Sequence, residues 1–312
     1  MYKMRTVRAF APATVANVSC GFDILGFALN DLGDEVHLTS TDSNEVTIQQ
    51  IIGDGGRLPL EVSKNTAGVA VLSFLKAVKL NFGVSIVLHK NLPLGSGMGS
   101  SAASAVAALI AINELTGVRL PKQDLLLHAM EAEGIACGSA HADNVAPSLL
   151  GGFILIRSYH PLDVIRVPLQ ATLFATLVHP HLELKTEDSR KILRPAISRE
   201  ESIQQSGNVA ALMVGLMTSD YDLISRTLTD TIAEPTRKLF IPGFEAIQSE
   251  AKRVGALGAG ISGSGPTIYA LSKDYATAQH AGQVMASSFQ QEGLKSDVII
   301  SKINPTGAMI LD

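Results

Sequence analysis

The stretch Asn91-Leu-Pro-Leu-Gly-Ser-Gly-Met-Gly-Ser-Ser-Ala-Ala103 carries the strongest structural signal in the chain. Its glycines at 95, 97 and 99 have no side chain and adopt positive φ readily, so they predict a bare loop. The apolar run from Ala102 to Ile112 lacks Gly and Pro and predicts a helix after the loop. We expect Ser100 or Ser101 to cap that helix, because a serine hydroxyl accepts a first-turn amide. Loop amides and the positive end of the helix dipole then converge on one point, which predicts a phosphate site.

This stretch differs from two phosphate-binding loops that occur in many proteins. The P-loop requires Gly-x4-Gly-Lys-Ser/Thr, and no lysine stands inside this stretch. The dinucleotide fingerprint Gly-x-Gly-x-x-Gly fails at its third position, because Ser100 follows Gly95 and Gly97 there. The sequence therefore predicts a third kind of phosphate loop, and a glycine-rich turn without a ligand is the alternative.

The composition favours a globular protein of one large domain or two ordinary ones. The chain has 312 residues, of which 46% are hydrophobic, so a sizeable core is expected and disorder is not. A net charge of −4 and few aromatic residues argue against a nucleic-acid partner. Two cysteines, Cys20 and Cys137, make no disulfide framework and favour a reduced, cytoplasmic setting. No signal peptide is apparent and no apolar run approaches the ~20 residues of a membrane span, so we expect no membrane partner.

Alternating and helical hydrophobic patterns predict a chain of mixed strands and helices. In the first part, strands are expected at 6–10, 35–41, 45–52, 84–89, 153–157 and 162–167, with a loop at 11–23. Helices are expected there at 66–81, 102–117 and from 122 onward. We place a domain boundary that divides the chain into 1–168 and 169–312. The second part is predicted to have strands at 174–179, 267–271 and 297–302 and helices at 202–218, 221–232, 243–254 and 276–290.

Two polar clusters outside the glycine-rich stretch are candidates for ligand binding. Asn17, Ser19 and Asp23 give the loop 11–23 polar tips that suit a small ligand with hydroxyl and ammonium groups, and an Asx turn is the alternative. His141, Asp143 and Asn144 lie within four residues. A His-x-Asp pair offers no tetrahedral ligand set, so we do not expect a zinc site there.

Residues 93–103 resemble, position by position, the ATP loop of the galactokinase, homoserine kinase, mevalonate kinase and phosphomevalonate kinase (GHMP) superfamily. The matching residues are Pro93, Leu94, Gly95, Ser96, Gly97, Met98, Gly99, Ser100, Ser101, Ala102 and Ala103. Segment 11–23 resembles the substrate loop of the homoserine kinase branch, and the glycine-rich segment 255–267 resembles the C-terminal motif of the superfamily. The resemblance implies an α+β fold in two parts. The N-terminal half would resemble the second domain of ribosomal protein S5, the C-terminal half would be ferredoxin-like, and the active site would lie between them.

The resemblance also implies ATP and Mg²⁺ as cofactors and L-homoserine as the substrate. It places Ser101 and Glu133 at Mg²⁺ and Asn65 near the nucleotide, where a plain helix cap is the alternative. Asp143 stands at the position often proposed as general base, and it either takes a proton or only orients groups. The homoserine contacts that the resemblance implies are Asn17, Asp23, His141, Asn144, Arg190, Arg237 and Gly260. Arginine suits this purpose because its guanidinium binds a carboxylate through two parallel hydrogen bonds.

Two other functions remain open at this stage. One is a sister GHMP kinase that acts on mevalonate or another small alcohol. The other is a nucleotide-binding sensor without catalysis, although Ser101, Glu133 and Asp143 are all present and argue against it. The assembly is also open, and a homodimer is the expectation that we carry forward.

Overall fold

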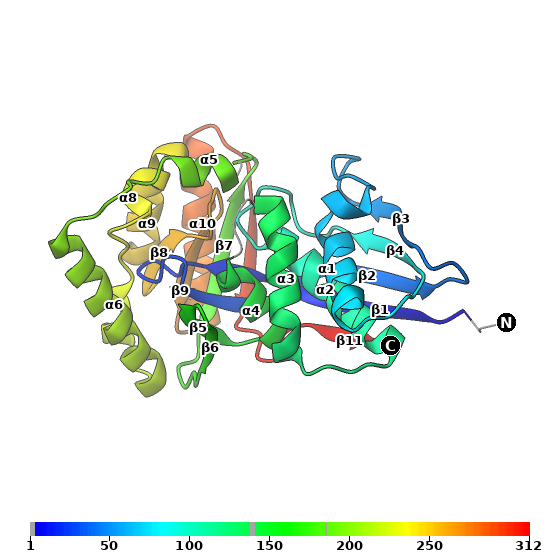
Figure 1. Cartoon of the computed structure of the whole chain (residues 1–312). Helices are drawn as coiled ribbons and strands as arrows, with labels where there is room; N and C mark the ends of the chain where they lie inside the picture. The colour runs from blue at the N-terminus through cyan, green and yellow to red at the C-terminus, as the bar shows by residue number, and fades with distance from the viewer. Residues whose placement is uncertain (1–3, 138–140, 185) are drawn as a thin grey trace.

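The computed structural model describes residues 4–137, 141–184 and 186–312, and two β-sheets with packed helices form its body (Figure 1). Within these residues the first sheet has seven strands. Its main path runs β11-β1-β2-β4-β3, and β5 and β6 extend from β2. The bounds are β1 (Thr6–Ala16), β2 (Leu25–Ser40), β3 (Val46–Ile52), β4 (Val84–His89), β5 (Phe153–Tyr159), β6 (Leu162–Val167) and β11 (Met309–Leu311).

The expected loop at 11–23 is wrong in its first half, because β1 continues to Ala16 and pairs with an extended β2. Pro12 suggested a break in the strand. The register between β1 and β2 shifts between Pro12 and Thr14, and a proline without an N–H is tolerated at such a bulge. The true loop occupies 17–24, where Asn17, Val18 and Ser19 all have positive φ. A run of non-glycine residues in this conformation stores strain, which is common at binding sites.

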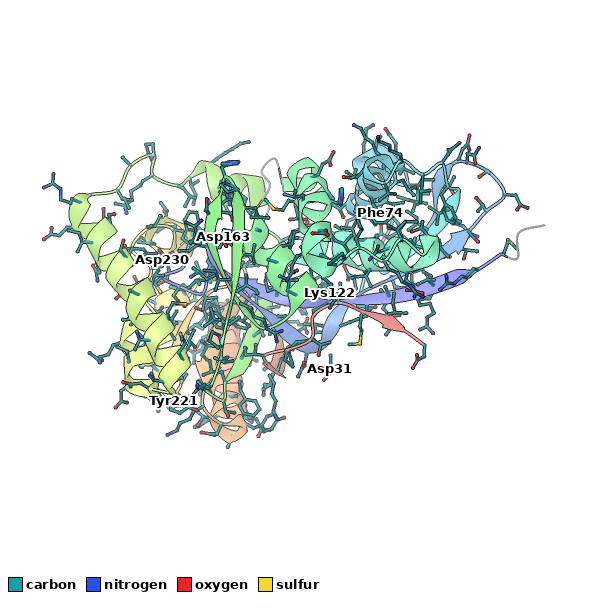
Figure 2. The ribbon with its side chains drawn as sticks, turned by 60° about the horizontal axis from the view of Figure 1, so that its bottom comes forward. Asp31, Phe74, Lys122, Asp163, Tyr221 and Asp230 are labelled. Carbon is teal, nitrogen blue, oxygen red and sulfur yellow. The ribbon has the colours of Figure 1, made fainter. Side chains whose placement is uncertain are left out.

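Helices cover one face of the first sheet (Figure 1). They are α1 (Thr66–Ala77), α2 (Ser100–Thr116), α3 (Lys122–Cys137) and α4 (Ala142–Leu150), with the short 3₁₀ helix η1 (Val62–Lys64) before α1. α2 packs on β1 and β2 and is covered by α1 and α3. This close packing is possible because many of the buried side chains of α2 are alanines. Phe74 of α1, labelled in Figure 2, is fully buried and packs edge-on against His128 of α3. α1 ends before the predicted residue 81.

The second sheet is antiparallel with the order β10-β7-β9-β8. Its strands are β7 (Phe174–Pro180), β8 (Gly258–Ile261), β9 (Ile268–Ser272) and β10 (Ser296–Lys302), and α9 (Phe244–Arg253) and α10 (Tyr275–Gln291) pack beside it. The strand-helix-strand-strand-helix-strand sequence is the ferredoxin-like arrangement that the resemblance implied. β8 lies inside the glycine-rich segment 255–267.

The remaining helices lie between β7 and β8 in the chain. They are α5 (Thr186–Lys191), α6 (Arg199–Thr218), α7 (Tyr221–Thr227), α8 (Glu234–Arg237) and the 3₁₀ helix η2 (Lys238–Phe240). The helix predicted at 221–232 therefore ends early. Asp230 explains the end, because its carboxylate accepts the backbone N–H groups of residues 232–234 and folds them into a turn.

The chain leaves the first sheet after β6 and enters the second at β7. We propose that the domain boundary lies between residues 168 and 169, in this connection, with β11 as a C-terminal return that pairs with β1 of the first sheet. Among the described residues, no helix combines the length and apolar character needed to cross a membrane.

Candidate active site

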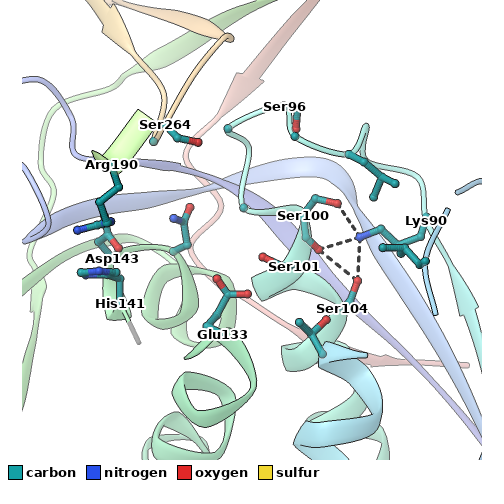
Figure 3. A pocket seen from close by; sticks show the side chains of 18 of the residues that line it. Lys90, Ser96, Ser100, Ser101, Ser104, Glu133, His141, Asp143, Arg190 and Ser264 are labelled. Carbon is teal, nitrogen blue, oxygen red and sulfur yellow. Dashed lines mark hydrogen bonds between the residues drawn. The ribbon is translucent and has the colours of Figure 1, made fainter. Parts of the chain in front are cut away.

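A cavity of about 440 Å³ lies where the two sheets meet, and most of the polar residues singled out in the sequence line it (Figure 3). Its walls come from the glycine-rich stretch 94–101, the loop after β1, the ends of α3 and α4, and residues 263–264 of the second glycine-rich segment. Arg190 and Arg237 reach it from the second part of the chain. The fold therefore gathers residues separated by more than two hundred positions around one space.

The glycine-rich stretch forms a loop whose glycines at 95, 97 and 99 have φ between 65° and 77°. The predicted serine cap is wrong, because Gly99 is the N-cap of α2 and Ser100 is the first helical residue. A β-carbon on Gly99 would lie 2.1 Å from Thr14 Oγ1, so the loop is pressed against β1 and only glycine fits there. The Ser100 hydroxyl instead accepts a hydrogen bond from Lys90.

The second glycine-rich segment, residues 255–267, donates hydrogen bonds to this loop. Ser262 Oγ donates to Gly97 O at 2.8 Å, and Thr267 Oγ1 donates to Ser96 O at 2.6 Å. The amide of Thr14 donates to Met98 O at 3.1 Å. Three successive loop carbonyls are thus held by the surrounding protein, and we expect the loop to offer a ligand mainly N–H groups, which suits an anion at a helix N-terminus.

The opposite end of the cavity is charged. Arg190 pairs with Asp23 through two parallel hydrogen bonds of 3.0 and 3.1 Å. Arg237 is only 3% exposed and donates to Gly263 O at 2.8 Å. The guanidinium groups lie 6.0 Å (Arg190) and 5.2 Å (Arg237) from the centre of the Phe22 ring. Burial, and next the neighbouring charge of Arg190, lower the pKa of Arg237.

Two asparagines connect the walls of the cavity. Asn17 donates from Nδ2 to Gly263 O at 2.8 Å, and its Oδ1 accepts the amide of Asp23 at 2.9 Å. Asn144 Oδ1 accepts a hydrogen bond of 2.7 Å from Thr14 Oγ1. Both side chains line the cavity as expected. Asn17 also fixes the backbone at Asp23 and Gly263, whereas Asn144 holds the side chain of Thr14.

Asp143 lies near the base of the cavity at the start of α4 and is 3% exposed (Figure 3). Burial raises the pKa of Asp143 to about 7, and the negative charge of Asp23 adds to this effect. Among the described residues, neither its Oδ1 nor the ring nitrogens of His141 have a hydrogen-bond partner. Burial is also the main reason why the pKa of His141 is lowered. A buried carboxyl that titrates near neutral pH is poised to accept a proton.

Glu133 of α3 and Ser101 of α2 line the same wall of the cavity (Figure 3). Glu133 is 7% exposed, so its side chain is largely removed from bulk water. A carboxylate and a hydroxyl are hard oxygen donors of the kind that Mg²⁺ prefers. The described residues hold no cluster of three His, Cys, Asp or Glu side chains suited to a metal.

Five of the predicted site residues do not line the cavity. Within the first loop, Pro93, Met98, Ala102 and Ala103 do not line the cavity, and the last three are fully buried beneath it. Gly260 lies in β8 behind Ser19 and does not line the cavity either, whereas Gly263 and Ser264 do. Asn65 both lines the cavity and caps α1, because its Oδ1 accepts the amide of Ala67 at 3.0 Å.

Lys90 and Tyr159 also contribute to the site, and neither was singled out in the sequence. Lys90 lines the cavity directly before the phosphate loop. The hydroxyl of Tyr159 donates to Asp23 O at 2.7 Å and accepts the amide of Ala142 at 3.2 Å, so it joins the first loop to α4. Only the position of Lys90 beside the glycines could have drawn attention to it in the sequence.

Comparisons with known proteins agree with this geometry. The family model for the GHMP kinases N terminal domain matches residues 65–152, and the model for the GHMP kinases C terminal region matches residues 212–291. The crystal structure of L. major mevalonate kinase matches at 17% identity with a TM-score of 0.70 over 97% of each chain, and it shows the shared fold. Fold and cavity together define a GHMP-type small-molecule kinase, and the expected two-part α+β fold is confirmed.

Relatives of higher sequence identity indicate which branch of the GHMP family the chain belongs to. The homoserine kinase of Chlorobaculum tepidum is 51% identical over 99% of both chains. The crystal structure of homoserine kinase from Cytophaga hutchinsonii superimposes with a TM-score of 0.96 at 50% identity, covering 100% of this chain and 98% of that one. The chain belongs to the homoserine kinases of the GHMP family.

Proposed function

We infer that this protein transfers the γ-phosphoryl group of ATP to the hydroxyl oxygen of L-homoserine. The products are ADP and O-phospho-L-homoserine, an intermediate on the way to threonine. The observation that carries this inference is the division of one cavity into a glycine loop at a helix N-terminus and a charged end with Asp23 and two arginines. The first suits a triphosphate and the second suits the ammonium and carboxylate of an amino acid.

We propose that loop residues 95–101 hold the phosphates, with the nucleoside toward Asn65, Leu58 and Pro59, which line the neighbouring wall. Homoserine then lies at the charged end. Arg237 and Arg190 bind its carboxylate, Asp23 binds its ammonium group, and Asn17, His141 and Asn144 orient it. The bound amino acid brings one charge of each sign, so it can replace the partners of the partly buried Arg190–Asp23 pair without leaving either charge unpaired.

We propose that Ser101 and Glu133 hold Mg²⁺ beside the phosphates. Two protein oxygens are enough, because Mg²⁺ keeps several of its waters and takes further ligands from phosphate. The ion would offset the negative charge of the transferring phosphoryl group. The protein supplies position. The loop fixes the phosphates, the arginines fix the amino acid, and Asp143 faces the space where the acceptor hydroxyl lies.

Replacing Ser101 by Ala is expected to lower kcat by at least about tenfold, because one oxygen donor to the metal is lost. The thermal midpoint should change little, since Ser101 is partly exposed on the cavity wall. Steady-state kinetics across a Mg²⁺ titration measures the effect, with Ser206→Ala on the outer helix α6 as the matched control. Activity retained within a few-fold at low Mg²⁺ would show that Ser101 is not a metal ligand.

An ADP-release assay with homoserine, serine, threonine and mevalonate side by side tests the function itself. Homoserine should give the highest kcat/KM. Preference for mevalonate would indicate a sister kinase, and ATP binding without ADP release on any acceptor would indicate a sensor.

We also propose that the enzyme is a cytoplasmic homodimer. The buried free thiol of Cys20 supports a reducing compartment. An exposed apolar row on α6, formed by Ile203, Val214 and Met217, supports self-association. Analytical ultracentrifugation of the wild type and of Val214→Lys measures the assembly.

A further inference from the structure

Lys90 and Asp34 form a buried ion pair beneath the phosphate loop. Lys90 follows β4 directly and is 5% exposed, and Asp34 lies in β2 and is fully buried. The ammonium group donates to the Asp34 carboxylate. Of the two residues, Lys90 lines the cavity, so the pair lies directly beneath the wall of the proposed nucleotide site.

Asp34 also holds the start of the phosphate loop. Its Oδ1 accepts the backbone amides of Asn91 at 3.0 Å and Leu92 at 3.1 Å. The side chain of Asn91 adds a bond of 3.0 Å to Gly33 O. Residues 91 and 92 are therefore fixed to β2 before the chain enters the glycines.

Lys90 holds the other end of the same loop. Its Nζ lies 2.8 Å from Ser100 O, 2.6 Å from Ser100 Oγ and 2.8 Å from Ser104 Oγ, all in the first turns of α2 (Figure 3). Ser104 Oγ in turn donates to Asp34 Oδ2 at 2.9 Å. Both ends of the loop thus converge on one ion pair.

We propose that Lys90 and Asp34 are a positioning pair that closes the phosphate loop at both ends and thereby sets the affinity for nucleotide phosphates. The glycines make the free loop flexible, and flexibility must be lost when phosphate binds. A loop that is already fixed at residues 91–92 and 100–104 loses less conformational freedom when phosphate binds, so binding costs less free energy. The pair carries no net charge, so its main effect is the placement of loop amides rather than long-range attraction. This proposal rests on the proposed nucleotide site.

The test compares ATP, ADP and adenosine by isothermal titration calorimetry on the full chain. Lys90→Met should weaken ATP and ADP by about tenfold or more, which is the effect of losing hydrogen bonds to a charged group. Adenosine should bind within twofold of wild type, because its contacts lie on the wall of Asn65, Leu58 and Pro59. The matched control is Lys122→Met, a partly exposed lysine that donates to Thr306 O and does not line the cavity.

Two further variants keep the test decisive if Lys90→Met does not fold. Ser104→Ala removes one shared hydroxyl and should weaken ATP in the same direction by a smaller factor. The double variant Asp34→Leu/Lys90→Met removes both charges, which often preserves stability where a single removal does not. It should keep a thermal midpoint closer to wild type and still lose the phosphate-dependent part of binding.

The outcomes separate this proposal from the function that it rests on. Equal losses for adenosine and ATP, or a folded double variant that binds ATP like wild type, would overturn the positioning role alone. A wild-type protein that binds adenosine as tightly as ATP would overturn the nucleotide site, and the role of Lys90 and Asp34 with it.

Discussion

Replacing Asp143 by Asn is expected to lower kcat by about 10²- to 10⁴-fold, the range typical of a lost general base. Asparagine has nearly the same shape, so the buried start of α4 should keep its packing. The pKa of about 7 makes Asp143 largely ionised slightly above neutral pH, when it can accept the proton that the homoserine hydroxyl releases as its oxygen forms the new bond to phosphorus. Steady-state kinetics with saturating ATP and homoserine measures the change, and Asp163→Asn on the β5–β6 hairpin is the control.

The pH profile gives a second, independent readout of Asp143. In the wild type, kcat/KM should rise with pH up to about 7 and then level, because the ionised carboxylate is the active form. This rise of kcat/KM with pH should be absent in Asp143→Asn. Between 3.8 and about 7 the folded carboxyl keeps a proton that the unfolded chain releases. The free energy of unfolding of the wild type should therefore fall relative to the variant as pH rises through this window. If Asp143→Asn loses less than tenfold in kcat and still shows the rise of kcat/KM with pH, Asp143 has an orienting role only.

Replacing Arg237 by Ala is expected to raise the KM for homoserine by about 100-fold, because a desolvated charge that binds a carboxylate is removed. The KM for ATP should stay within about threefold, since the side-chain hydrogen bonds of Arg237 go to Ser189 O and Gly263 O and not to loop residues 95–101. Equal damage to both substrates would contradict the carboxylate role. Arg253→Ala, at an exposed ion pair with Glu250, is the control for a lost arginine.

A truncated substrate identifies the group that Arg237 binds. 3-Aminopropan-1-ol is homoserine without its carboxylate. Wild type should use it far less well than homoserine, whereas Arg237→Ala should discriminate little between the two. Added guanidinium should restore part of the homoserine activity in the variant, because it can refill the vacated place beside Phe22. Discrimination that is unchanged by the substitution would place the substrate carboxylate elsewhere.

The phosphate loop was predictable because its signal is local. Glycines at 95, 97 and 99 must accommodate positive φ, and a helix pattern follows at once, so the sequence predicts a bare loop before a helix. Its end was mispredicted by one or two residues. Gly99 caps α2 because Thr14 of a distant strand presses against it, and no local preference of serine could reveal that contact.

The substrate end was predicted by resemblance residue by residue, yet its arrangement was not. Asp23 and Arg190 are 167 positions apart, and their pairing depends on how two sheets meet. Tyr159 and Asp34 carry no local signal of a role in the site, because each acts through contacts with residues that are distant in the sequence. For Gly260 the sequence does match the family motif, but the residue lies in β8 and does not line the cavity.

By itself the sequence determined that the chain has a glycine loop at a helix N-terminus, a mixed α and β fold and the residues of a GHMP kinase. The first two depend on backbone preferences and patterns within a few residues of each other, and the third depends on a resemblance to the superfamily. The tertiary structure alone decided that Lys90 meets Asp34, that β1 continues through Pro12 and that Asp143 is buried enough to titrate near neutral pH. Desolvation and long-range pairing produce these properties, and both arise only when distant segments pack together.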